Sequence, residues 1–192
     1  MPGDSRTGER VTGAGETATR DLVRTALLAA ACAAVGYLLA AVPNVELISA
    51  AVFTSGALVG VRRGALVGGV AEAIYAGINP NGVSQPVLYV AQVLGFVALG
   101  AAGGALGPLL RRGPLALQTC LAAASGFLLT LAYDVLTNAA VWVTVRENAS
   151  LVAIEFAGLS FPFPLAHALG NTLGFALVVP AVLRAARSWS GP

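Results

Sequence analysis

The sequence predicts an all-α membrane protein with six transmembrane helices and both termini in the cytoplasm. Of its 192 residues, 57% are hydrophobic and only 10% are charged, whereas an average soluble domain is about 25% charged. The hydrophobic residues form long blocks between short polar breaks, and the arginines gather in alternate breaks. These observations favour a single bundle of membrane helices over a soluble domain.

The apolar blocks define the predicted spans. A Pro-Asn pair follows the first block, Arg-Arg-Gly turns follow the second and the fourth, and Asn-Pro-Asn-Gly follows the third. The predicted spans are residues 22–42, 45–60, 65–78, 86–110, 114–145 and 161–183. A helix needs about 20 residues to cross the hydrocarbon core, so the second and third spans are short and require a locally thin bilayer. The fifth block is unusually long.

The arginines support this number of spans and orient them. Six spans place both termini on one face, together with ten of the eleven basic residues, and leave only Arg146 on the other face. Basic residues are retained in the cytoplasm during insertion. We therefore expect residues 1–20 to be a flexible cytoplasmic tail, residues 21–187 to be a six-helix membrane domain, and residues 188–192 to be a C-terminal tail.

Composition and motifs exclude several functions. The net charge of +2 provides no electrostatic basis for a nucleic-acid partner. The chain has no lysine, and a Walker A loop needs one, so any ATPase that drives transport is a separate polypeptide. Neither His-Glu-x-x-His nor Gly-x-Ser-x-Gly occurs, and Cys32 and Cys120 lie in apolar runs, where we interpret them as packing residues. We expect no catalytic activity, metal or cofactor.

Polar residues gather in the outer halves of the predicted spans, where they are costly unless they face a partner or a wet cavity. Asp134, Asn138 and Trp142 are each four residues apart and share one helical face, and His167 and Asn171 do the same. These groups form either a pocket open to the outside or polar contacts that join helices. The candidate substrate-binding residues are Asn44, Glu46, Glu72, Tyr75, Asn79, Asn81, Gln92, Asp134, Asn138, Trp142, His167 and Asn171.

The first span carries a strip of small residues on its cytoplasmic half. Ala26, Ala30 and Ala34 recur at every fourth position, and small side chains at this spacing let another helix approach closely. The strip either docks a partner protein or packs inside the bundle.

The chain resembles the substrate-capture subunit (S component) of energy-coupling factor (ECF) vitamin transporters over about residues 22–187. The matching features are Pro43-Asn44-Val45-Glu46, Gly56 to Gly60 with the turn Arg62-Arg63-Gly64, Asn79-Pro80-Asn81-Gly82 leading to Pro86, Gln92 with Gly95, Tyr133-Asp134-x-x-Thr137-Asn138, and the Ala26/Ala30/Ala34 strip.

The resemblance implies a multi-pass protein of a prokaryotic plasma membrane that binds a vitamin or precursor near the outer face. It also implies assembly with a transmembrane coupling subunit and a pair of ATPases, and toppling within the lipid bilayer to release the substrate inside. The chain lacks the Met-His start of the cobalt and nickel branch, so we do not expect metal uptake. The carboxylates and amides with Trp142 and Tyr75 suit a neutral or cationic ring-bearing ligand that is rich in donors.

Three rival functions make different predictions about the sequence. A stand-alone secondary transporter or channel predicts polar residues along both halves of the bundle, and internal repeats. An intramembrane enzyme predicts a catalytic pair or metal ligands. A structural or assembly protein predicts that the outer polar groups only join helices.

Overall fold

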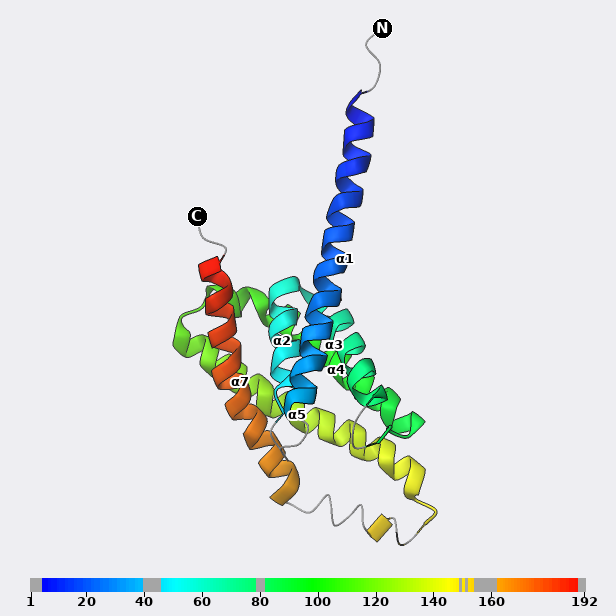
Figure 1. Ribbon diagram of the computed structural model, residues 1–192. Coiled ribbons are helices and arrows are strands. Elements are labelled where there is room, and N and C mark those ends of the chain that lie inside the picture. The colour runs from blue at the N-terminus through cyan, green and yellow to red at the C-terminus, as the bar shows by residue number, and fades with distance from the viewer. Residues whose placement is uncertain are drawn as a thin grey trace.

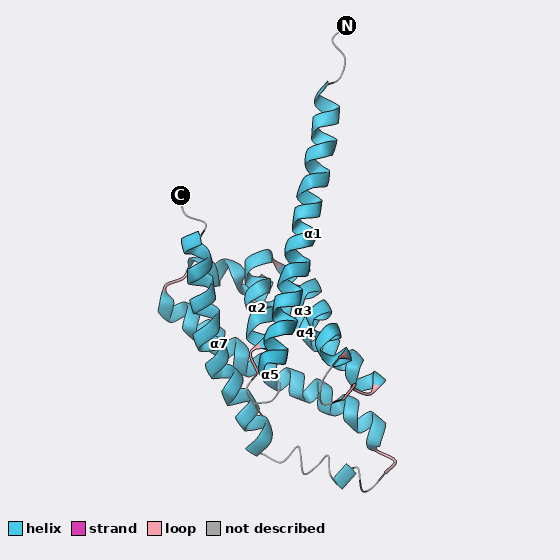
Figure 2. Ribbon diagram, in the orientation of Figure 1, coloured by secondary structure: helices cyan, strands magenta, loops and turns pink. Residues whose placement is uncertain are grey.

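The computed structural model describes residues 5–39, 46–78, 82–148, 150, 152–153 and 162–189. Over these residues the protein is all-α (Figures 1 and 2). The six helices of this described part are α1 (Ser5–Leu39), α2 (Ile48–Val59), α3 (Val61–Gly77), α4 (Pro86–Arg112), α5 (Leu115–Val145) and α7 (Pro162–Trp189).

Four helical stretches are long and apolar enough to cross a membrane. They are Gly15–Leu38, Pro86–Arg112, Leu115–Val145 and Pro164–Ser188. Large apolar side chains on them face outward: Leu38 is 79% exposed, Val135 71% and Leu177 70%. A surface of this kind is suited to lipid, and the chain is therefore a multi-pass membrane protein.

The second and third helices are shorter than a full span. α2 is an apolar helix of 12 residues, and α3 has 17 residues. At a rise of 1.5 Å per residue, α2 covers about 18 Å, against about 30 Å for the hydrocarbon core. The structure therefore supports four candidate spans and a shorter apolar helix, and six full crossings stay a prediction. The predicted block 45–60 is longer because it includes Glu46 and Leu47, which precede the helix, and Gly60, which follows it.

The helical ends extend beyond the predicted domain limits. α1 begins at Ser5, so residues 5–20 carry helical backbone where we expected a flexible tail, and α7 continues to Trp189. This N-terminal part of α1 projects away from the other helices (Figure 1). Adding a residue to an existing helix is much easier than nucleating a new helix. The helical conformation of the apolar part of α1 can therefore continue into the polar sequence that precedes it.

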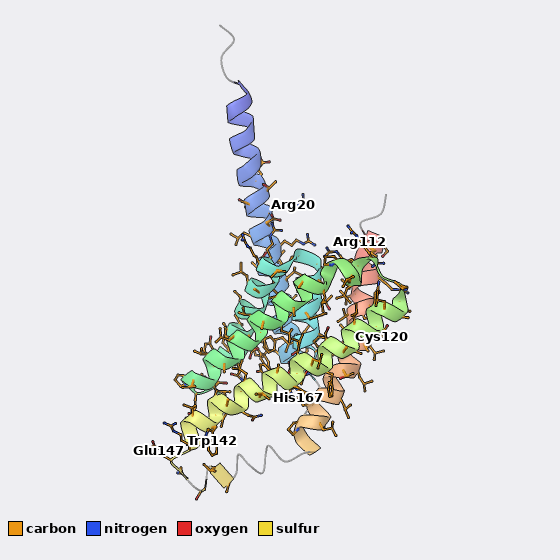
Figure 3. All side chains as sticks on the ribbon, turned by 180° about the vertical axis from the view of Figure 1, so that it is seen from behind. Arg20, Arg112, Cys120, Trp142, Glu147 and His167 are labelled. Atoms are coloured by element: carbon orange, nitrogen blue, oxygen red, sulfur yellow. The ribbon has the colours of Figure 1, made fainter. Side chains whose placement is uncertain are left out.

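Successive helices run in alternating directions (Figure 1). The α2–α3 and α4–α5 connections lie at the end of the bundle where α1 enters and α7 leaves. We call this end the arginine end, because Arg20 and Arg112 lie there, whereas Trp142 and Glu147 lie at the opposite end (Figure 3). The start of α2, the start of α4 and the end of α5 are all at the opposite end.

α2 is the central helix of the bundle. It packs against α1, α3, α4 and α7. Ile48, Val52 and Phe53 on α2 are fully buried, and the ring centroid of Phe53 lies 5.2 Å from that of Phe175 on α7. A short helix surrounded by others needs apolar residues on all its faces, as α2 has.

Glycines bring α2, α3 and α4 into backbone contact. Gly60, with a φ of 90°, makes the sharp turn between α2 and α3, a conformation that glycine adopts without strain. A Cβ atom on Gly100 of α4 would overlap the carbonyl oxygen of Gly64, and one on Gly103 would overlap that of Phe53. Small residues at such positions allow the close approach that holds membrane helices together. This contact holds α3 and α4 side by side, and both carry candidate site residues.

Candidate functional site

The candidate site is built around His167, in the first turns of α7. Its Nδ1 atom lies 2.9 Å from Oδ1 of Asp134 on α5, and its Nε2 atom lies 3.2 Å from Nδ2 of Asn171. His167 and Asn171 are one helical turn apart, so both face α5. The ring therefore has a polar partner at each nitrogen and connects α5 with α7.

The segment before α2 adds two more polar groups. Oε2 of Glu46 lies 3.6 Å from Nε2 of His167, and the Ser49 hydroxyl donates a hydrogen bond to Oε1 of Glu46. We call Glu46, Ser49, Asp134, His167 and Asn171 the His167 cluster. It joins three parts of the chain that are distant in sequence.

Three buried oxygens in or near this cluster lack a hydrogen-bond partner within the described part of the chain. They are Oε2 of Glu72 on α3, Oε1 of Gln92 on α4 and Oδ2 of Asp134 on α5. Glu72 is only 2% exposed and lies within electrostatic range of Glu46, and Gln92 lies beside Tyr133. An unsatisfied buried polar group costs about 1–3 kcal/mol, so each of these oxygens would gain from a partner such as a ligand or a water molecule.

The charge of the site is acidic. Glu46, Glu72 and Asp134 supply three carboxyl groups, against one imidazole from His167. Arg146 is the one arginine that follows α5 at this end of the bundle, and it is exposed. Over the residues described, no three His, Cys, Asp or Glu side chains are arranged to hold a metal ion. The site can therefore accept hydrogen bonds from a ligand better than it can neutralise an anion.

Aromatic residues border the polar groups. Tyr75 on α3 packs against Tyr37 on α1, with ring centroids 5.2 Å apart, and the Tyr37 hydroxyl donates to the carbonyl of Ile74 at 2.8 Å. Tyr133 on α5 packs edge-on against Phe96 on α4, with centroids 5.6 Å apart. These contacts position Tyr75 and Tyr133 on helices that also carry Glu72 and Asp134.

The structure brings together part of the predicted residue set. Glu46, Asp134, His167 and Asn171 meet in one cluster, and Glu72, Gln92 and Tyr75 lie on neighbouring helices at the same end. Asn138 is half-buried one turn beyond Asp134, and Trp142 is 42% exposed near the end of α5. The other three predicted residues, Asn44, Asn79 and Asn81, lie outside the described residues.

Sequence reasoning missed Ser49. Its signal was the spacing Glu46-x-x-Ser49 at the start of a predicted helix, because residues three apart share a face of the first turn. Serine is common in membrane helices as a packing residue, so without the contact to Glu46 nothing distinguished it from Ser55.

The alanine strip on α1 is exposed. Ala26, Ala30 and Ala34 all face outward, while Ala29 and Ala33 are buried against the bundle. Docking of a partner on this strip stays a prediction.

Comparisons with protein-family models, with curated proteins and with solved structures give no match. No family is thereby identified for the chain.

Proposed function

We propose that the protein is a membrane-embedded substrate-capture subunit that binds a vitamin or related micronutrient beside the His167 cluster. The observation that carries this proposal is the set of unpartnered buried oxygens on Glu72, Gln92 and Asp134. They come from three different helices: Asp134 belongs to the His167 cluster, Glu72 lies within electrostatic range of Glu46 in that cluster, and Gln92 lies beside Tyr133 on the helix of Asp134. A ligand with several N–H or O–H donors would satisfy all of them at once.

The alternative role for these residues is to join helices, and the His167 cluster does connect α5, α7 and the start of α2. A cluster that served only this role would satisfy its own polar atoms, because each unsatisfied one weakens the contact. The excess of carboxyl groups over basic groups favours a neutral or cationic ligand and disfavours a multiply anionic one.

The proposed orientation places the arginine end in the cytoplasm, as the retention of basic residues predicts. The ligand then binds from the extracellular side, and the plasma membrane of a prokaryote is the proposed location. A chain without lysine has no Walker A loop, so we assign the ATP-driven step to a separate ATPase pair. A transmembrane coupling subunit docked on Ala26, Ala30 and Ala34 would connect this chain to the ATPase pair. The S components that the sequence resembles likewise bind the substrate, while separate subunits couple and hydrolyse ATP.

One observation favours a second candidate, a stand-alone secondary transporter or channel. Buried polar residues continue along α5 towards the arginine end, at Thr130, Ser125 and Gln118, and Oε1 of Gln118 lacks a partner within the described residues. A transporter would line both halves of the bundle with polar groups. Uptake of the ligand into proteoliposomes that contain this protein alone would support the second candidate, and binding without uptake supports the first.

The first experiment identifies the ligand. The protein is purified in detergent, denatured, and the released small molecules are analysed by mass spectrometry. The identified compound is then titrated against wild type, Asp134→Ala and the control Glu147→Ala, whose carboxylate is exposed at the same end. Loss of one buried polar contact costs about 1–3 kcal/mol, so Asp134→Ala should weaken binding about tenfold or more. Equal affinity of the two variants and wild type would remove Asp134 from the site.

A further inference from the structure

A groove between α1, α2 and α7 points to a second binding site, independent of the proposed function. We propose that it binds one anionic phospholipid, with an acyl chain in the groove and the headgroup phosphate on Arg20 and Arg24. Apolar and basic surfaces adjoin here in the order that such a lipid requires.

The groove has the chemistry of an acyl-chain site. It has a volume of about 270 Å³ and is lined mainly by Leu28, Val35, Leu47, Ala51, Leu58 and Val178. The polar groups on its floor are already engaged: Cys32 Sγ lies 3.5 Å from Ser55 Oγ, and the Thr54 hydroxyl donates to the carbonyl of Ala50 at 2.6 Å. A hydrocarbon chain therefore meets a surface without free donors or acceptors.

The length of the groove matches one leaflet. It follows α2 from Leu47 to Leu58, which corresponds to about 16 Å at 1.5 Å per residue. Half of the hydrocarbon core of a bilayer is about 15 Å thick. An acyl chain that lies along α2 would therefore have its headgroup just beyond Leu58, at the arginine end.

A basic surface begins where the groove ends. It lies on α1, which contributes Leu28 to the groove and continues beyond it with Asp21, Arg20 and Arg24. Arg20, Arg24 and Leu28 are spaced by four residues, so they share one face of α1. Both guanidinium groups are exposed, and neither forms an ion pair within the described ranges.

The carboxylate on this surface of α1 has its own partner. Asp21 forms an ion pair with Arg63 on α3, which reduces its repulsion of a phosphate. Guanidinium groups bind phosphate through paired hydrogen bonds, and each basic residue near a membrane surface adds to the attraction of an anionic lipid. Arg20 and Arg24 are thus left to bind the headgroup. A zwitterionic lipid would retain only part of this attraction, because its amine opposes the arginines.

The test is lipid retention by the purified full chain. The protein is exchanged into detergent with equal amounts of phosphatidylglycerol and phosphatidylcholine of the same acyl chains, and bound lipid is measured by native mass spectrometry. Wild type should retain one phosphatidylglycerol. The double variant Arg20→Gln/Arg24→Gln should bind it about ten- to thirtyfold more weakly. The matched control Arg112→Gln/Arg184→Gln removes the same charge from exposed positions at the same end, away from the groove, and should retain the lipid.

A second variant pair tests the groove itself. Ala31→Trp fills the groove from an exposed position on α1 and should lower retention several-fold, while Ala124→Trp, exposed on α5, should not. Equal retention of the two lipids by wild type would overturn the proposal. So would equal losses in the arginine variant and its matched control, or retention that Ala31→Trp leaves unchanged.

Discussion

Replacing Gly100 by alanine tests whether backbone contact between α3 and α4 holds the bundle together. A Cβ atom on Gly100 would lie 2.6 Å from the carbonyl carbon of Gly64 and would overlap its oxygen. Carbon atoms pack at about 3.5–4.0 Å, so the two helices must move apart by roughly 1 Å. Both obstructing atoms belong to the backbone and cannot rotate away.

The expected cost of Gly100→Ala follows from this displacement. Overpacking a well-packed contact costs about 1–3 kcal/mol, and the better helix propensity of alanine returns up to about 1 kcal/mol. We therefore expect a net loss of up to roughly 2 kcal/mol in the free energy of unfolding. The neighbouring close contact of Gly103 with Phe53 lies on the same helix and would be loosened by the same movement, which would raise the cost.

Gly174→Ala is the matched control. Gly174 also lies inside a long apolar helix, α7, but its Cβ would meet only Leu47 Cδ2 at 3.4 Å and the Glu46 carbonyl oxygen at 4.0 Å, which is ordinary contact. This variant should be neutral or more stable by up to about 1 kcal/mol. The assay is reversible unfolding of both variants in mixed micelles, followed by circular dichroism. Equal shifts of the two midpoints would refute the argument from backbone contact.

Three further predictions concern the core, the cluster and the alanine strip. Phe175→Ala removes a fully buried ring and should lower the free energy of unfolding by about 3–5 kcal/mol. The control Leu177→Ala truncates a side chain that is 70% exposed and should change this free energy little. Similar losses in the two variants would contradict the burial argument. His167→Ala deprives Asp134 and Asn171 of a partner and should cost about 1–3 kcal/mol in the same assay, and an unchanged midpoint would mean that the cluster adds no stability. Ala30→Leu should abolish co-purification of a transmembrane partner with normal ligand binding, and an intact complex would count against the docking strip.

The polar cluster illustrates where sequence reasoning succeeded and where it stopped. The spacing of His167 and Asn171, and the depth of Asp134 in a long apolar block, predicted polar groups at one end of the bundle. The spacing did not say which of them touch. Contacts between α5, α7 and the start of α2 depend on the order in which helices pack, and a single sequence carries little information about that order.

The glycines show the same difference between what the sequence predicts and what only the structure shows. The sequence presents glycine at positions 56, 60, 64 and 68, and again at 100, 103, 104 and 107, which indicates close helix packing of some kind. Only the structure pairs Gly64 with Gly100 and Gly103 with Phe53. The short length of α2 is likewise explained by its central position, because a helix enclosed by four others need not span the bilayer.

The sequence by itself determined the class of protein: long apolar blocks, few charges and arginines in alternate breaks allow little other than a bundle of membrane helices. It also determined which polar residues are buried in apolar helices and therefore need a partner. The tertiary structure alone decided which of these residues meet, which oxygens stay without a partner, and which faces of α1 remain exposed. The physical reason is that helix formation and membrane burial depend on local composition, whereas contacts between helices depend on the shapes of surfaces that are distant in sequence.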